Sequence, residues 1–125
     1  MKKELLRVII FCLVLFTTNS SAQCWISISA GSNHSLALKN DGSLWVWGEN
    51  SEGVLGDGTF VNKSSPTQIG TATDWLKIDT GSYKSFAIKT NGTLWAWGRN
   101  TESELGNGTT ISSNIPIQIG TCRVS

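Results

Sequence analysis

The chain contains one sequence unit twice, at a constant offset of 50 residues. Residues 25–71 align with residues 75–121 without a gap, and 23 of the 47 aligned positions are identical. A period near 50 residues, made of short apolar stretches between glycine-containing turns, is typical of a β-propeller blade. Such a blade cannot bury both of its faces alone, so blades stack on one another. We therefore expect an all-β array of stacked repeats.

Each repeat is expected to form a four-stranded antiparallel sheet. In the first repeat, period-2 alternation and turn signals predict strands at 25–28, 35–39, 43–47 and 66–69. Gly42 and Gly92 end the Asx-containing turns that a tight hairpin needs, because glycine tolerates positive φ. The sequence thus predicts two blades, residues 25–74 and 75–121, and an incomplete propeller.

The repeat resembles the regulator of chromosome condensation repeat. The resemblance is carried by Gly31-x-x-His-Ser-Leu-Ala-Leu-Lys39, Asp41-Gly42, Trp45-x-Trp-Gly48, Asn50 and Leu55-Gly56, with counterparts 50 residues further on. It implies a propeller, usually of seven blades, so two repeats fall short of a closed ring. The product is then expected either to be a fragment of a longer array or to close a ring by association of several chains.

Residues 1–22 have the layout of a secretory signal peptide. Lys2 and Lys3 precede an apolar run at 8–16, and Ser20-Ser21-Ala22 supplies small residues for cleavage. The run is too short to span a bilayer, so no membrane span is expected. We expect a secreted or cell-surface protein, of bacterial type, that begins at Gln23. A lipoprotein signal would instead acylate Cys24, but a large polar Gln23 is a poor residue before such a site.

Two cysteines, Cys24 and Cys122, remain after the signal, and both lie just outside the repeats. In an exported protein they can form a disulfide that joins the ends of the array. Free thiols, or a bridge to another chain, remain open alternatives. The last residues, 122–125, diverge from the expected start of a third repeat, which indicates a truncation or a longer array.

Charge and composition argue against several classes of function. Without residues 1–22 the chain carries seven basic and eight acidic residues, a net charge of −1 with no basic stripe, so no nucleic-acid partner is expected. His34 is the only histidine, and no nucleophile, carboxylate or metal-ligand pattern accompanies it. It is interpreted as a hydrogen-bonding loop residue. We expect no cofactor, no metal and no catalytic centre.

The positions that differ between repeats are the candidates for binding. Asn33 and His34 of the first repeat correspond to Tyr83 and Lys84 of the second, and Glu49 corresponds to Arg99. Propellers bind through such loops because the sheets hold them in place while their side chains vary. Tyr83 is the best single anchor, as a rigid aromatic side chain with a polar tip.

The paired tryptophans allow two interpretations. Trp45 and Trp47, with Trp95 and Trp97, could form exposed platforms for sugars, or could fill the wedge between blades. Their presence in both repeats favours the structural role. Our hypothesis is a non-enzymatic scaffold that binds an unidentified protein, and the alternative is a carbohydrate-binding module. An enzyme, or the start of a larger surface protein, are further alternatives.

Overall fold

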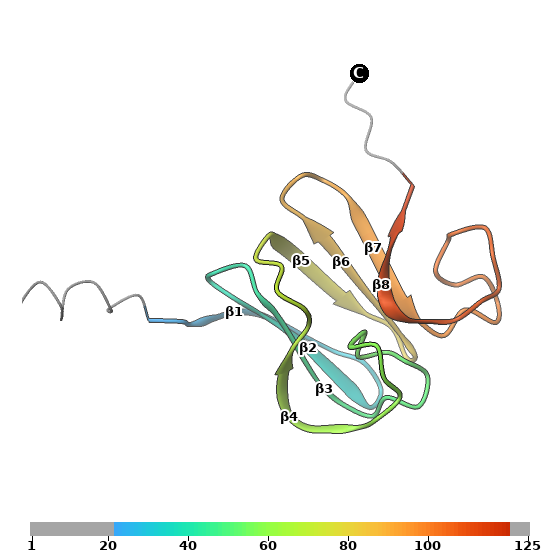
Figure 1. The fold of residues 1–125 in the computed structure, drawn as a ribbon, viewed down its shortest axis with the longest axis horizontal. Coiled ribbons are helices and arrows are strands. Elements are labelled where there is room, and N and C mark those ends of the chain that lie inside the picture. Colours follow the sequence, from blue (N-terminus) through green and yellow to red (C-terminus); the bar gives the residue numbers. More distant parts are fainter. Residues whose placement is uncertain (1–21, 121–125) are drawn as a thin grey trace, which may run out of the picture.

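The structure, a computed structural model, describes residues 22–120, which form eight strands in two sheets. Blade 1 consists of β1 (Trp25–Ala30), β2 (His34–Lys39), β3 (Leu44–Gly48) and β4 (Lys63–Gln68). Blade 2 consists of β5 (Trp75–Thr80), β6 (Lys84–Lys89), β7 (Leu94–Gly98) and β8 (Ser113–Ile119). Both sheets are antiparallel meanders in chain order (Figure 1). The expected all-β fold with two four-stranded blades is confirmed. Ala22 apart, the expected signal peptide lies outside the described residues, as does the tail 122–125.

The register gives every sheet two different faces. In blade 1, Leu36 pairs with Val46, and the neighbouring Ala37 pairs with Trp45. Side chains alternate along a strand, so leucine and valine share one face and the tryptophans share the other. We call the tryptophan face of each blade the front face and the opposite face the rear face. In blade 2, Phe86 and Ala96 form the corresponding pair on the rear face.

The core lies between the blades. The rear face of blade 1 packs against the front face of blade 2, and the cluster joins residues from both. Its fully or nearly buried members are Leu36, Leu38, Leu44, Val46, Val54, Leu55, Ile69, Trp75, Ala87 and Trp97. Each blade therefore completes its neighbour, as a blade with two apolar faces requires.

Residues at equivalent positions of the two repeats are buried in one blade and exposed in the other. Trp75 is 6% exposed, whereas its counterpart Trp25 is 51% exposed. On the opposite faces, Leu44 is fully buried and its counterpart Leu94 is 37% exposed. The front face of blade 1 and the rear face of blade 2 are consequently open in this structure.

Gly42, in the β2–β3 hairpin, is required by close packing as well as by backbone conformation. Gly42 has φ of 81°, and a Cβ there would collide with the carbonyl of Thr73. Just after it, the Ser43 N–H and hydroxyl both donate to the Asp41 carboxylate, at 2.9 and 2.6 Å. The Ser43 hydroxyl in turn accepts the Trp45 indole N–H at 2.8 Å. This chain of bonds fixes the hairpin and the first front-face tryptophan together.

The outer strand β4 begins at Lys63, three residues before the range that the sequence predicted. The first half of the strand, Lys63 to Ser65, carries no apolar side chain and so gave no alternation signal. It belongs to the sheet because Lys63 pairs with Gly48 of β3 through the backbone, across a bulge. Pro66 therefore lies inside this edge strand, where proline is tolerated.

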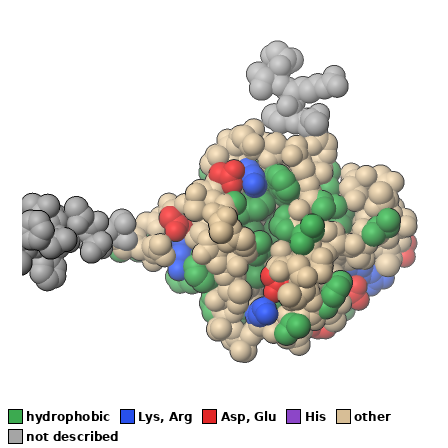
Figure 2. Space-filling view, in the orientation of Figure 1, with side chains coloured by type: hydrophobic (Ala, Val, Ile, Leu, Met, Phe, Trp, Pro, Cys, Tyr) green, Lys and Arg blue, Asp and Glu red, His purple; other side chains and the backbone are tan. Residues whose placement is uncertain are grey.

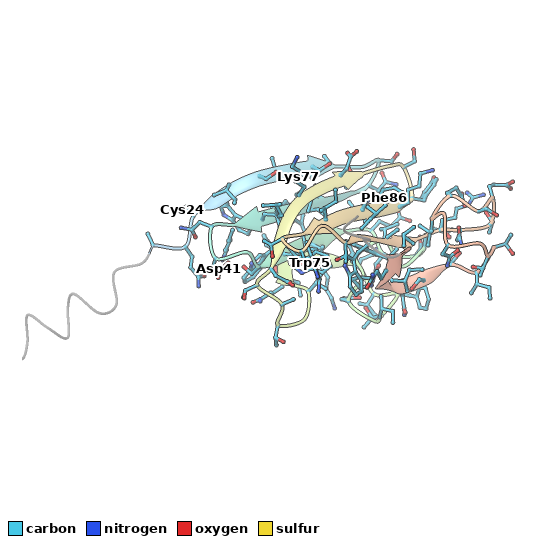
Figure 3. All side chains as sticks on the ribbon, turned by 90° about the horizontal axis from the view of Figure 1, so that it is seen from above. Cys24, Asp41, Trp75, Lys77 and Phe86 are labelled. Atoms are coloured by element: carbon cyan, nitrogen blue, oxygen red, sulfur yellow. The ribbon has the colours of Figure 1, made fainter. Side chains whose placement is uncertain are left out.

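Cys24 is exposed and lies beside the β2–β3 hairpin, close to Asp41 (Figure 3). Its N–H donates to the Asn40 side chain at 3.2 Å. Cys122 lies outside the described residues, so a Cys24–Cys122 disulfide stays a prediction. Between residues 22 and 120 there is no helix with the length and apolarity needed to cross a membrane.

Candidate functional site

The long β3–β4 and β7–β8 loops are each organised by one buried asparagine. The Asn50 amide N–H₂ group donates to the Thr59 carbonyl at 2.9 Å and to the Val61 carbonyl at 3.2 Å. Its carbonyl oxygen accepts the Leu55 N–H at 3.0 Å. Asn100 makes the same set of bonds in blade 2, and both asparagines are fully buried. These loops are therefore fixed structures, and both lie at the same end of the molecule, away from the hairpins (Figure 1).

Four of the candidate binding residues meet at this end. Asn33 and Tyr83 lie in the β1–β2 and β5–β6 loops, and Glu49 and Arg99 lie just after β3 and β7. We call these four residues the loop-end surface. The Glu49 N–H donates to the Asn33 carbonyl at 2.8 Å, and the Arg99 N–H donates to the Tyr83 carbonyl at the same distance. The backbone is the same in both blades, and only the side chains differ.

In blade 1 the pair is polar and acidic. The Asn33 amide donates to one Glu49 carboxylate oxygen at 2.7 Å, and the Ser51 hydroxyl donates to the other at 2.8 Å. These hydrogen bonds, from Ser51 first and then Asn33, lower the pKa of Glu49 below its ordinary value. Glu49 therefore stays ionised at neutral pH.

In blade 2 the pair is aromatic and basic. The Arg99 guanidinium lies over the Tyr83 ring, 5.8 Å from its centroid, and Tyr83 is 42% exposed. Arg99 also approaches the Glu104 carboxylate at 3.8 Å and donates to the Thr101 hydroxyl at 2.9 Å. The loop-end surface thus presents an acid over blade 1 and an aromatic–cation pair over blade 2. Figure 2 shows acidic and basic side chains close together on the visible face, among separate hydrophobic spots.

The other two candidates, His34 and Lys84, begin the strands β2 and β6 and do not belong to the loops themselves. His34 begins β2, is 4% exposed, and its Nε2 lies 3.0 Å from the Ser85 hydroxyl of blade 2. Burial lowers the pKa of His34, with a smaller opposite effect from a backbone hydrogen bond at Lys84. His34 is therefore a neutral contact between the blades. Lys84 occupies the same position in blade 2, on the side that faces away from blade 1.

Only a small crevice separates the two halves of the loop-end surface. It is lined by Asn33, His34, Glu49, Ser51, Glu52, Val54, Ser82 and Tyr83, and its volume is about 10 Å³. That is room for about one water molecule. Small-molecule sites usually measure hundreds of cubic ångströms, so this crevice is too small to be one. A separate, open hollow of about 360 Å³ lies beside it and is lined by Ala30, Gly31, Ser32, Thr80, Gly81 and Ser82. Within residues 22–120 there is also no group of three histidine, cysteine or acidic residues placed to hold a metal ion.

The tryptophans belong to the blade faces. Trp97 is fully buried between the blades, and its indole N–H donates to the Val54 carbonyl at 2.8 Å. The Lys39 ammonium lies 3.9 Å from the centroid of Trp45, and Lys89 lies 4.5 Å from that of Trp95. A cation over each ring occupies a face on which a sugar would have to stack.

Two important contacts were not predicted as parts of a site. The asparagines at 50 and 100 belonged to the family pattern, but nothing in the sequence showed that each would bind its whole loop. The carbonyl of Val54 accepts both the Trp97 indole and, at 2.7 Å, the Ser85 hydroxyl. A backbone group leaves no trace in the sequence, so this contact between blades could not have been inferred.

Family models match both repeats. The "Regulator of chromosome condensation (RCC1) repeat" is found by one model at residues 25–54 and 75–104, and by a second model at 41–88 and 91–125. The second match covers well over half of the chain.

Curated relatives match a single stretch. The X-linked retinitis pigmentosa GTPase regulator of Homo sapiens is 50% identical over 42 residues, which is 34% of this chain and 4% of that protein. The probable E3 ubiquitin-protein ligase HERC6 of Homo sapiens is 44% identical over 45 residues, or 35% of this chain and 4% of that protein. The chain thus spans only a few per cent of the length of these relatives.

Solved structures share the fold over most of the described residues. Yeast RCC1 (Prp20), in its complex with Kap60, superposes with a TM-score of 0.74 at 24% identity, over 81% of this chain and 26% of that chain. Human WBSCR16 superposes with a TM-score of 0.71, also at 24% identity, over 82% of this chain and 27% of that chain. Both the repeat pattern and the blade geometry lead to one assignment: this chain belongs to the regulator of chromosome condensation repeat family.

Proposed function

We propose that the chain is an exported, non-enzymatic protein-binding scaffold that contacts its partner through the loop-end surface. One observation carries this proposal. The Asn33–Glu49 pair and the Tyr83–Arg99 pair occupy equivalent positions on the same backbone, and both members of the pair differ between the blades. A scaffold that holds its backbone fixed while changing exposed, paired side chains is built for recognition.

The chemistry of the surface favours a protein as the partner. Tyrosine and arginine are enriched among the residues that contribute most to protein interfaces. A half-exposed Tyr83 held by Arg99 is a rigid anchor with a cation beside it, and Glu49, which lines the same crevice as Tyr83, adds a negative charge. The crevice of about 10 Å³ leaves no room for a small ligand. A partner with an apolar contact for Tyr83 and a basic group for Glu49 would fit.

The relatives support protein binding in general terms. Two are named as a GTPase regulator and as a ubiquitin ligase, and one similar structure is yeast Prp20 bound to Kap60. None of these partners is carried over to this chain, since fold alone does not imply function. Nothing in the comparisons supports the carbohydrate alternative. Export rests on residues 1–22, whose charge and apolar pattern is that of a cleavable signal.

The binding proposal is tested by cross-linking capture from the native surroundings. Wild-type chain is compared with Tyr83→Ala and Arg99→Ala, and with Leu76→Ala, which removes an exposed apolar side chain at the opposite end. We expect a protein captured by the wild type and by Leu76→Ala, and captured at least tenfold less by the two loop-end variants. Equal capture by all four chains would show that the surface has no binding role.

The export proposal is tested separately by mass spectrometry of the chain produced with its N-terminus intact. We expect the recovered protein outside the cytoplasm to begin at Gln23. An intact chain that still begins at Met1 and remains in the cytoplasm would contradict export, whatever the capture experiment gives.

A further inference from the structure

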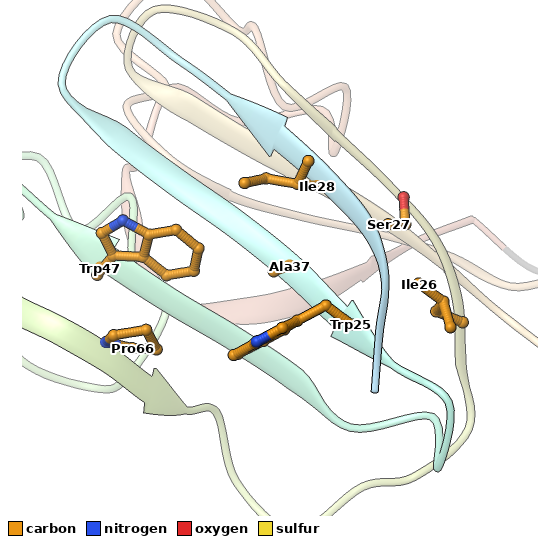
Figure 4. Close-up of a pocket in the computed structure, with 7 residues that line it drawn as sticks. All are labelled: Trp25, Ile26, Ser27, Ile28, Ala37, Trp47 and Pro66. Carbon is orange, nitrogen blue, oxygen red and sulfur yellow. The ribbon is translucent and has the colours of Figure 1, made fainter. Parts of the chain in front are cut away.

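The open blade faces carry two hollows lined mainly by apolar side chains. The first, of about 490 Å³, lies on the front face of blade 1 and is lined by Trp25, Ile26, Ser27, Ile28, Ala37, Trp47 and Pro66 (Figure 4). The second, of about 330 Å³, involves the rear face of blade 2 and includes Lys77, Phe86, Ile88 and Leu94. Lys77 and Phe86, on neighbouring strands, are labelled in Figure 3. Exposed apolar surface of this extent indicates a missing neighbour.

The interface already formed inside the chain shows what that neighbour looks like. There, a rear face (Leu36, Leu38, Leu44) covers a front face (Trp75, Trp97), and all five residues are at most 6% exposed. The open front face carries the counterparts Trp25 and Trp47, and the open rear face carries Phe86, Ile88 and Leu94. The two open faces are thus the two halves of an interface whose geometry the structure contains once.

The open rear face keeps the volume of a packed one. In blade 1 the directly opposed pair is Leu36 and Val46, and in blade 2 it is Phe86 and Ala96. The larger side chain on β6 is matched by a smaller one on β7. Cores tolerate substitutions that conserve volume. This compensation is expected of a surface that packs against something.

The polar contacts of the interface also have counterparts. Inside the chain, the Val54 carbonyl accepts the Trp97 indole and the Ser85 hydroxyl. The equivalent groups on the open faces are the Glu104 carbonyl, Trp47 and Ser35. Trp47 makes no indole hydrogen bond within residues 22–120, so its N–H is available for such a carbonyl. His34, next to Ser85, is replaced by Lys84, which is also a donor.

We propose that a second copy of this chain occupies each open face, with the rear face of blade 2 packed on the front face of blade 1 of the next copy. Such a head-to-tail contact is heterologous, and it forms a ring when the rotation between copies closes. Propellers typically contain four to eight blades. Because each copy adds two blades, closure takes two, three or four copies and always gives an even number of blades.

The junction between copies differs from the internal one in ways that make it weaker. The hydrogen bond between the Ser29 and Thr80 hydroxyls, 2.7 Å long, has no equivalent, because Asp79 would face Ala30. A Cβ at Gly53 would lie 2.9 Å from Asn114, and the counterpart of Gly53 is Ser103, with φ of 61°. Ser103 must therefore shift slightly to meet the next copy. We expect a reversible assembly.

The test uses one substitution on each face and a matched control. Ile28→Lys places a charge on the open front face, where Ile28 is 68% exposed, and Leu94→Lys does the same on the open rear face. Leu94 is 37% exposed, so a lysine at either position can reach solvent in a single copy. The control is Ile111→Lys, because Ile111 is 73% exposed and lies in the β7–β8 loop, away from both faces.

Solution mass is measured by light scattering over a range of concentrations, with circular dichroism to confirm that each variant is folded. The wild type and Ile111→Lys are expected at two to four times the chain mass. Ile28→Lys and Leu94→Lys are each expected at the mass of one chain. A mixture of these two variants should form a 1:1 dimer and nothing larger, since each retains the face that the other lacks.

The opposite results are equally clear. A folded wild type at the mass of one chain, at concentrations up to about 100 µM, would overturn the proposal. So would a mixture of the two variants that remains monomeric, or a control that dissociates as they do. These results do not depend on capture of a partner by the loop-end surface, so the two proposals can fail separately.

Discussion

Gly56 and Gly106 offer a matched test of the packing between blades. Both have a left-handed backbone, with φ of 70° and 74°. A Cβ at Gly56 would lie 2.6 Å from the Trp97 indole nitrogen, whereas a Cβ at Gly106 would meet only a methyl group of Ile119 at 3.9 Å. Gly56→Ala and Gly106→Ala therefore share the backbone strain and differ in the contact with the neighbouring blade.

The difference in the free energy of unfolding follows from these contacts. A non-glycine residue in the left-handed region costs about 1–2 kcal/mol, which applies to both variants. Forcing an extra methyl group into a packed core costs about 1–3 kcal/mol more, and this applies only to Gly56→Ala. The Trp97 ring must also move away from the Val54 carbonyl, which accepts its indole N–H at 2.8 Å. We expect Gly56→Ala to be less stable than Gly106→Ala by about 2 kcal/mol.

Thermal melts followed by circular dichroism and tryptophan emission measure this difference. For a domain of this size, about 2 kcal/mol corresponds to a Tm difference of roughly 8–16 °C. Emission from Gly56→Ala should shift to the red, because Trp97 loses its buried position. Both variants are made on the Leu94→Lys background, so that a second copy adds no neighbour to Gly106. Equal melting temperatures, or a lower one for Gly106→Ala, would refute the packing described between the blades.

Three further predictions concern the loops and pH. Asn50→Ala should lower the free energy of unfolding by about 3 kcal/mol, which is about 1 kcal/mol more than the effect of Asn100→Ala. The difference arises because Asn50 also donates to the charged Asp57 at 3.2 Å, whereas Asn100 donates to the neutral Asn107. Urea unfolding measures both effects, with the variant Asn33→Ala, at an exposed residue, as control. Burial lowers the pKa of His34, so stability should fall as pH decreases below about 6.5, and His34→Gln should remove that part of the pH dependence in melts between pH 8 and pH 5. Burial tends to raise the pKa of Asp57, but hydrogen bonds from Thr59 and Asn50 and the charge of Lys63 lower this pKa on balance. The ionised Asp57 therefore stabilises the fold above about pH 4, and this stabilisation is lost as the pH falls further. Asp57→Asn should reduce that loss of stability.

The strands could be predicted because the information for them is local. The alternation at Leu36 to Lys39 and at Leu44 to Trp47 assigned the strands and their faces, and the turn before Gly42 fixed the hairpin. The start of β4 was missed for the complementary reason. Lys63 joins the sheet through backbone bonds alone, which the side-chain pattern does not record.

The candidate site was harder to predict because the burial of a side chain depends on whether a neighbouring blade covers it. Asn33 and His34 are adjacent, and both differ from their counterparts, yet one is exposed and the other is buried against Ser85. Strand alternation alone could have suggested that His34 shares the rear face with Leu36. That this face would be covered follows only from the packing of blade 2.

The tryptophans show most clearly that burial depends on the neighbouring blade. Trp25 and Trp75 begin equivalent strands. Each lies within 6.3 Å, centroid to centroid, of two other tryptophans of its blade, and each has a lysine ammonium over its ring. Their local surroundings are the same, but one is half exposed and the other is buried. Repetition therefore identifies what a blade needs, and it cannot distinguish a terminal face from an internal one. The open front face retains the tryptophans of the internal interface, which is the observation that the proposed contact between copies would explain.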